Sequence, residues 1–485
     1  MKKIRLTLLV IALILLISVP TASGTSQTVT CPYNPTVQEI LNQVTEGAVT
    51  QWIRNFSGED FVPIEGEPRK ILTRYSSQLF STNPDAMAYP YLGELLERFG
   101  YEQGTYLTDH SYSPYNIFES KKEVIKESIS KDGEGLLSLD QNVKFLGQTL
   151  TWKNKIVTIP GHGPNADEIV LMTAHLDSIS YEEPNTNAPG AEDNGSGVAA
   201  LMEAARLFRF YKFDRTIKII FFTGEEQGLL GSVSYVADHP AEMDYIMGVV
   251  NLDMFGYDSD DDHCFELHVG TRADSNVVGT CFTDVIENYG LNLTFDYLTD
   301  GATGISDHAS FWSANVGAVE VLENFFNSSL ADGCVGQDRN PNYHHITDRI
   351  ANMNLPVTLS IAQAGIGTVA SLVEPIGPCF ATDPVITATT LTDTILLSWP
   401  EVVDADIYNV YRSDSSCEGI FTQIAQVTSN NYEDTDIELD KYYFYKVQAA
   451  ESDGVCYSQM SNCAGARVEE PVFFDFYIPF VITGE

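Results

Sequence analysis

Between residues 165 and 375, apolar runs alternate with a segment of helical periodicity. Four short apolar runs are typical of buried strands: 168–177 (EIVLMTAHLD), 216–226 (TIKIIFFTGEE), 246–255 (IMGVVNLDMF) and 317–323 (GAVEVLE). In the segment 197–208 the apolar residues share one helical face. Strands that alternate with helices predict an α/β fold with a mixed, mostly parallel sheet flanked by helices.

The pattern changes after residue 375. Segments rich in β-branched and aromatic residues, separated by polar turns, predict a small all-β sandwich at 380–468, followed by a tail at 469–485. The sandwich resembles a fibronectin type III module, with Trp399 on an early strand and Tyr408 on the next. We therefore expect a larger domain at 25–375 and an accessory module behind it. The partner of that module, a protein or a polysaccharide, stays open.

The first residues favour an exported protein. Lys2, Lys3 and Arg5 precede an apolar run at 6–19, and small residues follow, so residues 1–24 are predicted to be a secretory signal peptide. A membrane anchor is the alternative, but the run is shorter than the ~20 residues of a spanning helix. No later stretch is predicted to span a membrane. Whether a short pro-segment follows the cleavage site stays open.

Eight cysteines follow the predicted cleavage site, at positions 31, 264, 281, 334, 379, 417, 456 and 463. None of them forms a CxxC motif, and in an exported chain an even number indicates disulfides. Sequence alone does not determine how they pair. Within the accessory module we expect bonds between Cys379 and Cys463 and between Cys417 and Cys456, with other pairings left open.

The charge of the chain excludes one class of partner. The 485 residues include 27 Lys and Arg against 67 Asp and Glu, which gives a formal net charge of −40 at pH 7. Such a chain repels DNA, RNA and anionic membranes. Because 44% of the residues are hydrophobic, the acidity belongs to a folded protein and not to a disordered polyanion.

Metal-binding side chains follow the ends of the predicted strands. The candidates are His175, Asp177, Asp193, Glu225, Glu226, Asp253 and His344. Open α/β sheets bind ligands at the carboxyl ends of their strands, so we expect these side chains to meet there. A single His or Asp at a strand end is more often a capping or surface residue, but the whole set favours a metal site. Two imidazoles and three carboxylates, one of them shared, suit two divalent ions such as zinc.

Together and in this order, the motifs resemble those of the secreted co-catalytic zinc aminopeptidases, which are related to bacterial leucyl aminopeptidase. The resemblance covers about residues 45–373. It implies two zinc ions with these ligands: Asp193 as the bridge, His175 and Asp253 for one ion, and Glu226 and His344 for the other.

The resemblance also implies roles for the neighbours of these ligands. Glu225 would be the general base of the reaction. Asp177 would orient the imidazole of His175, as carboxylates beside metal-bound histidines commonly do. The peptide bond between Asp193 and Asn194 would be cis.

One ligand has a neighbour of the same type. His344 follows the aromatic Tyr343 and precedes Asp348 by four positions, as the ligand does in the family, so His344 is preferred over His345.

Two further polar segments lie outside the ligand set. Asp307 and His308, in GISDHASFWSANV (304–316), are assigned to substrate contact or to support of the ligands, with a purely structural role as an equal alternative. The run DSDDDH (258–263) is compatible with calcium but lacks the glycine and terminal glutamate of an EF-hand loop, so a solvated acidic loop is preferred.

The resemblance implies an exported zinc exopeptidase, an aminopeptidase that hydrolyses the N-terminal bond of peptides with a free N-terminus. The alternatives are a carboxypeptidase or a glutaminyl cyclase on the same scaffold, or an inactive binding or adhesion protein. The GxSxG, GxxxxGK[ST] and HExxH motifs are absent from the sequence, so serine hydrolases of that type, P-loop NTPases and zincins lack their defining residues.

Overall fold

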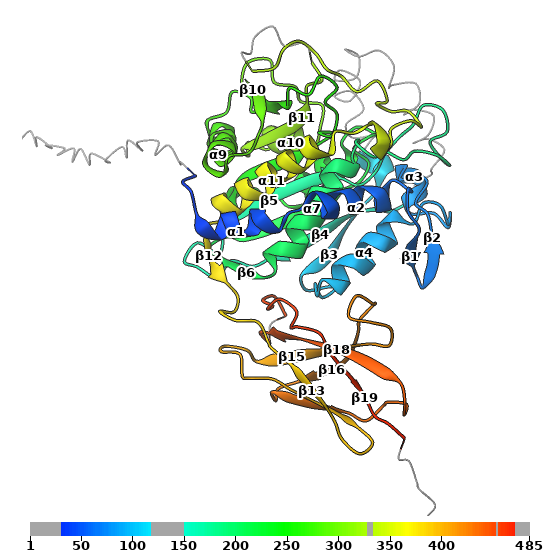
Figure 1. Ribbon diagram of the computed structural model, residues 1–485. Helices are drawn as coiled ribbons and strands as arrows, with labels where there is room; N and C mark the ends of the chain where they lie inside the picture. The colour runs from blue at the N-terminus through cyan, green and yellow to red at the C-terminus, as the bar shows by residue number, and fades with distance from the viewer. Residues whose placement is uncertain (1–30, 118–149, 327–332, 453, 471–485) are drawn as a thin grey trace, which may run out of the picture.

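A computed structural model describes residues 31–117, 150–326, 333–452 and 454–470 of the chain (Figure 1). The predicted signal peptide and most of the predicted tail lie outside these residues. The described chain forms a large α/β part and, below it in Figure 1, a part made of β-strands.

The α/β part is built on an eight-stranded sheet with the strand order β10-β9-β11-β8-β5-β7-β4-β3. The strands are β3 (Leu107–Tyr112), β4 (Trp152–Ile159), β5 (Ile169–His175), β7 (Thr216–Phe222), β8 (Ile246–Leu252), β9 (Cys264–His268), β10 (Thr294–Leu298) and β11 (Ala318–Glu323). The central pairs β11–β8, β8–β5 and β5–β7 are parallel, whereas β11–β9, β7–β4 and β4–β3 are antiparallel. The predicted mixed, mostly parallel sheet is confirmed.

Helices cover both faces of this sheet. They are α1 (Pro35–Gln43), α2 (Glu46–Phe56), α3 (Ser76–Leu79), α4 (Ala88–Arg98), α7 (Gly195–Phe208), α8 (Leu230–Asp238), α9 (Ala273–Tyr289), α10 (His308–Ser313) and α11 (Leu355–Leu372), with short 3-10 turns at Met243–Tyr245 and Ile350–Asn352. The main hydrophobic core joins α1, α2, α7 and α11 to one face, as Figure 1 shows, and a second cluster packs α8 and α10 on the other. Two-stranded pairs lie outside the large sheet: β1 (Val62–Ile64) with β2 (Glu67–Arg69), and β6 (Tyr211–Phe213) with β12 (Pro375–Pro378).

Helix α11 corrects one expectation from the sequence. It is long and apolar enough to cross a membrane, although no stretch after the signal peptide was expected to be. Its apolar side chains, among them Ile361, Ile366 and Val369, are buried in the main core against α7 and α9. In the described chain, therefore, α11 is a core helix of the α/β part.

The β-strand part has its own hydrophobic core, around Trp399, Tyr408 and Tyr445. Its three-stranded sheet consists of β13 (Thr387–Thr390), β14 (Ile395–Ser398) and β17 (Asn431–Asp434), and its four-stranded sheet of β16 (Thr422–Val427), β15 (Ile407–Ser413), β18 (Tyr442–Ala450) and β19 (Ala464–Arg467). All pairings within these sheets are antiparallel. The all-β fold agrees with the prediction, while its likeness to fibronectin type III and the domain limits stay predictions.

The two parts are held together by specific contacts at the end of α7. The guanidinium of Arg209 lies 3.9 Å from the ring centroid of Tyr457, and its carbonyl accepts a hydrogen bond of 3.2 Å from the Tyr457 amide. Lys212 forms an ion pair of 2.5 Å with Glu451. These contacts lie at the helix end opposite to Gly195, where α7 begins.

Four disulfides join the eight cysteines that follow the predicted signal peptide: Cys31–Cys281, Cys264–Cys334, Cys379–Cys456 and Cys417–Cys463. The expected pairing within the accessory module was wrong. Cys456 lies beside the bridge between Ala450 and Tyr457, at the contact with the α/β part where Cys379 also lies, whereas Cys463 directly precedes β19. The order of the cysteines along the chain did not show that Cys379 and Cys456 lie side by side.

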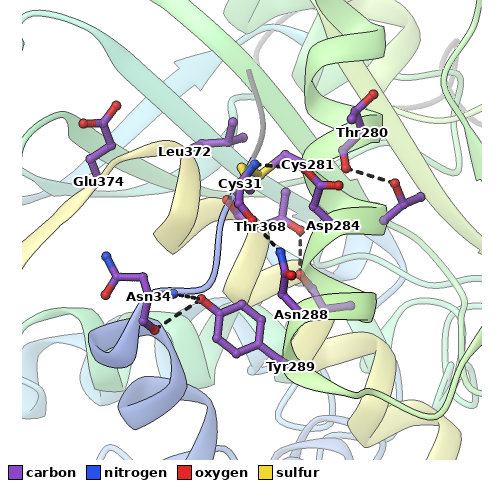
Figure 2. The surroundings of a disulfide bond; sticks show 12 residues. Cys31, Asn34, Thr280, Cys281, Asp284, Asn288, Tyr289, Thr368, Leu372 and Glu374 are labelled. Carbon is purple, nitrogen blue, oxygen red and sulfur yellow. Dashed lines mark hydrogen bonds between the residues drawn. A yellow bond between two sulfur atoms is a disulfide. The ribbon is translucent and has the colours of Figure 1, made fainter. Parts of the chain in front are cut away.

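The Cys31–Cys281 bond ties the start of the described chain to α9 (Figure 2). Around it, the Cys31 amide donates to Asp284, at 2.9 Å, and Asn288 donates to the Cys31 carbonyl, at 2.8 Å. The Tyr289 hydroxyl contacts both the amide and the carbonyl of Asn34, which caps α1. The first described helix is therefore fixed covalently and by hydrogen bonds.

Candidate metal centre

The predicted ligands meet at one edge of the large sheet. His175 is the last residue of β5, Asp253 follows β8 and Glu226 lies shortly after β7. Because these three strands are parallel neighbours, their carboxyl ends point to the same side. Asp193 lies just before α7, and His344 comes from the loop between β11 and α11.

Two groups of potential ligands share Asp193. In the first, Nε2 of His175 lies 3.0 Å from Oδ1 of Asp253 and 3.3 Å from Oδ1 of Asp193. In the second, Nε2 of His344 lies 3.2 Å from Oδ2 of Asp193 and 3.1 Å from Oε2 of Glu226. Each oxygen of the Asp193 carboxylate thus faces one histidine, which is the arrangement expected of a bridging ligand.

The donor set fits divalent cations. Within the described chain, the only ion pairs of Asp193, Glu226 and Asp253 are those with the two histidines. The second oxygen of Glu226, Oε1, is buried and makes no hydrogen bond to a described residue. Buried carboxylates require a compensating positive charge, and imidazole nitrogen with carboxylate oxygen is a set that zinc prefers.

The pKa values reflect this crowding of buried anions. Burial lowers the pKa of His175, but Asp253 and Glu225 outweigh it and raise that pKa well above its usual range. Burial, opposed by His344, raises the pKa of Glu226 to about 7. Burial also acts to raise the pKa of Asp193, but its hydrogen bonds with both histidines lower it. The carboxylates therefore compete for the positive charge of only two imidazoles.

Asp177 makes more contacts at the site than the single contact with His175 that was predicted for it. Nδ1 of His175 lies 3.0 Å from the backbone carbonyl of Asp177 and 3.7 Å from its carboxylate, so the closer partner is the carbonyl. The carboxylate accepts a hydrogen bond of 2.6 Å from Ser76 and longer ones, of 3.4 and 3.3 Å, from the amides of Glu225 and Glu226. Asp177 thus links the ends of β5 and β7.

Further residues that hold the ligands were not identified from the sequence. Both carboxylate oxygens of Asp348 accept backbone amides, from Glu192 at 3.0 Å and from Asp193 at 3.1 Å. Ser306 donates to Oδ2 of Asp253, at 2.6 Å. Asp348 served only as a marker of the His344 motif, and Ser306 directly precedes Asp307, so both lay beside motifs already noted.

Arg74 is a further supporting residue that was not identified from the sequence. Its guanidinium is fully buried and donates to four backbone carbonyls: those of Leu176 at 2.7 Å, Phe56 at 2.8 Å, Pro189 at 2.6 Å and Gly190 at 2.8 Å. It therefore joins the segment behind His175 to the loop before Asp193. Arg74 lies in a segment without a strand or helix pattern, and no sequence signal pointed to it.

The two neighbouring histidines point in different directions. His344 faces Asp193 and Glu226 with Nε2, whereas Nδ1 of the exposed His345 lies 2.7 Å from the carboxylate of Glu182. The geometry thus places His344, and not His345, in the ligand group. The peptide bond between Asp193 and Asn194 is cis.

Asp307 and His308 are fully buried. Nε2 of His308 lies 2.9 Å from the carbonyl of Thr303 and 3.5 Å from Glu320. Burial lowers the pKa of His308 to about 3 and raises that of Asp307 to about 7. This burial favours the supporting or structural alternative over direct substrate contact.

The acidic loop at 258–263 brings carboxylates together at the surface. Oxygen atoms of Asp258, Asp260 and Asp262 lie within 4.8 Å of one another, and Asp258 forms a second such group with Asp261 and His263. Exposed acidic side chains gather in this way without an ion, so the solvated acidic loop stays the preferred prediction.

Comparison with known proteins concerns the α/β part. Residues 154–369 match peptidase family M28. This match spans less than half of the chain, so the chain is similar to that family over this segment. The M28 segment runs from within β4 past β11 and includes all the candidate ligands.

The relatives of the M28 segment are aminopeptidases by name. A probable leucine aminopeptidase of Trichophyton verrucosum is 27% identical over 263 residues, which cover 53% of this chain and 65% of that protein. Aminopeptidase YwaD of Bacillus subtilis is 37% identical over 158 residues, 32% of each chain. A solved structure of a zinc aminopeptidase from Bacillus subtilis aligns with 46% of this chain and 50% of its own, at 28% identity and a TM-score of 0.39. The chain thus spans less than two thirds of the length of these relatives.

Proposed function

We propose that this protein is a metallo-aminopeptidase that hydrolyses the N-terminal bond of peptides. The observation that carries the proposal is the pair of ligand groups joined by the two oxygens of Asp193, with Glu225 beside them. The match of the segment to peptidase family M28 supports peptide hydrolysis, and the names of its relatives support a substrate with a free N-terminus.

The distances support a division of the ligands between two ions. Asp193, His175 and Asp253 would hold one zinc ion, and Asp193, Glu226 and His344 the other. When bound, such ions lower the pKa of a coordinated water and polarise a carbonyl oxygen. The resulting site suits attack on an amide bond.

Glu225 is the residue assigned to proton transfer. Its Oε2 lies 4.0 Å from Nε2 of His175, so it borders the ligand group without completing it. Burial raises the pKa of Glu225, His175 opposes this shift, and Asp253 and Glu226 add to it. A carboxylate with a raised pKa is a better proton acceptor near neutral pH, and it can then return the proton to the leaving amine.

The cysteines support an extracellular location for this activity. All eight cysteines after the predicted signal peptide form disulfides, and such bonds persist in oxidising compartments. We therefore propose a secreted enzyme.

The Glu225→Gln variant tests the proposal. We expect it to keep the wild-type zinc content and to lose turnover by roughly 10²- to 10⁴-fold, because the amide cannot accept the proton. Hydrolysis of an aminoacyl-nitroanilide and zinc content would be measured together, with an N-blocked substrate as control. Near wild-type turnover with intact zinc would refute the role of Glu225. Equal cleavage of the N-blocked and the free substrate would contradict the aminopeptidase assignment. Release of ammonia from an N-terminal glutamine would favour a glutaminyl cyclase instead.

A further inference from the structure

A loop beside the candidate metal centre contacts the segment that carries His344. The amide of Tyr181 donates to the carbonyl of His344, at 2.9 Å, and the Tyr181 hydroxyl lies 3.0 Å from Nδ1 of the same histidine. The two rings meet edge to face, with centroids 5.3 Å apart. Tyr181 is 57% exposed, so its ring contributes little to the hydrophobic core.

This contact occupies the nitrogen of His344 that does not face the carboxylates. Nε2 points at Asp193 and Glu226, and the hydroxyl of Tyr181 is the hydrogen-bond partner of Nδ1. When the phenol oxygen accepts the Nδ1 proton, the lone pair of the neutral imidazole remains on Nε2, where a metal ligand needs it.

The corresponding contact of His175 is different. Its Nδ1 lies 3.0 Å from the backbone carbonyl of Asp177, on a fully buried segment at the end of β5. A side-chain substitution cannot remove that carbonyl. The Nδ1 contact of His344, in contrast, comes from one hydroxyl group on an exposed side chain.

We propose that Tyr181 is a positioning residue for the metal ion held by Glu226 and His344. Its hydroxyl fixes the tautomer and the ring orientation of His344 and thereby raises the affinity of this half of the centre. The proposal rests on the proposed function, because it requires that the centre binds metal. Partners of metal-bound histidines are typically worth about 10- to 100-fold in affinity or activity.

Glu182 provides a second contact between the same segments. Its carboxylate lies 2.7 Å from Nδ1 of His345 and accepts the amide of Ile346, at 3.2 Å. Both side chains of the Glu182–His345 pair are about two-fifths exposed, and such pairs contribute little in water. Removing the charge of this contact, with Glu182→Gln, shows whether the ion pair between the two segments, rather than the Tyr181 hydroxyl, controls the metal.

The test compares three variants of the full chain: Tyr181→Phe, Glu182→Gln and Tyr245→Phe. Tyr181→Phe keeps the ring and deletes only the hydroxyl. Tyr245 is 53% exposed, a match for Tyr181, and lies in the 3-10 turn at Met243–Tyr245, at the end of β8 opposite to Asp253. Zinc affinity would be measured by competition with a chromophoric chelator, and the coordination of Co²⁺ by its visible absorption. Thermal unfolding of the metal-free proteins reports on folding.

We expect Tyr181→Phe to weaken one of two zinc-binding steps by about 10- to 100-fold and to change the Co²⁺ spectrum, while the other two variants keep wild-type binding. Metal-free Tyr181→Phe should unfold at the wild-type temperature. Unchanged zinc affinity in Tyr181→Phe, or an equal loss in Glu182→Gln, would overturn the proposal. If the wild-type protein itself bound no zinc, the proposed function would fail instead.

Discussion

The two halves of the candidate metal centre use the same chemistry but are built differently. Each offers one imidazole and one carboxylate of its own, and both share Asp193. His175 lies at the end of a central strand and its side chain is 2% exposed, whereas His344 lies in a loop and is 14% exposed. The halves differ in what holds the histidine, the sheet for His175 and a loop for His344, whereas Asp253 and Glu226 both follow strands.

This difference extends to the residues behind the ligands. The His175 half is held by backbone carbonyls, by Asp177 and by the buried Arg74. The His344 half depends on the exposed Tyr181. We therefore expect the first half to remain formed when the second is perturbed, and substitutions can test this order.

The largest effect is expected from Asp193→Ala, because this residue belongs to both halves. The variant should lose both ions and with them several kcal/mol of transition-state stabilisation, which corresponds to roughly a thousand-fold loss in rate. Zinc content and aminoacyl-nitroanilide hydrolysis measure the two losses. A variant that retained one tightly bound ion would show that Asp193 does not bridge.

A matched control for this variant is His345→Ala. His345 lies next to a proposed ligand but pairs with the exposed Glu182, so the variant should keep its zinc and its activity. Loss of zinc in this control would exchange the roles of the two histidines.

A large effect on stability is expected from Arg74→Met, which acts on the sheet-held half. The substitution removes a donor from four backbone carbonyls, of which that of Gly190 keeps the amide of Gly195, and each buried unsatisfied group costs about 1–3 kcal/mol. The free energy of unfolding should fall by at least ~3 kcal/mol in urea titrations. Arg54→Met, which removes a more exposed ion pair with Asp60, is the control and should cost less than ~1 kcal/mol. Equal effects of the two variants would contradict the role of Arg74.

A smaller effect is expected from pH, through the half that contains Glu226 and His344. In the metal-free protein, burial raises the pKa of Glu226 from 4.5 to about 7. A raised pKa favours the folded state below the ordinary pKa, and this contribution is lost as the pH rises from about 4.5 to 7. The melting temperature of the metal-free protein should therefore fall over this range by at least ~2 °C, and Glu226→Gln should flatten the dependence. Zinc should stabilise the protein more at pH 8 than at pH 5.5, because its ligands must lose their protons. An unchanged slope in Glu226→Gln would assign the dependence to other groups.

Hydrophobic patterns predicted the centre of the fold but not its margins. The four predicted strands correspond to β5, β7, β8 and β11, which are buried and apolar throughout most of their length. Strand β9 was missed because Glu266 and His268 interrupt its apolar pattern, although both are buried and lie 2.9 Å apart. A polar pair inside a sheet gives no signal in hydropathy.

The ligands were easier to find than the residues that hold them. Strand ends bring His175, Glu226 and Asp253 together by topology alone, so their types and positions were informative. Arg74 and Tyr181 act through contacts with segments about 100 and 160 residues away, which no local pattern encodes. The predicted disulfide pairing of the accessory module was wrong for the same reason, because it too depends on contacts between distant segments.

The Cys31–Cys281 disulfide has a consequence for proteolytic processing (Figure 2). A cut before Cys31 would release everything upstream, including the predicted signal peptide. A single cut at any bond between residues 32 and 280 would instead leave both fragments covalently joined, since the disulfide bridges the break. Such a nicked molecule would migrate as one species until it is reduced, so gels run with and without reductant would distinguish an internal cut from the removal of the upstream segment.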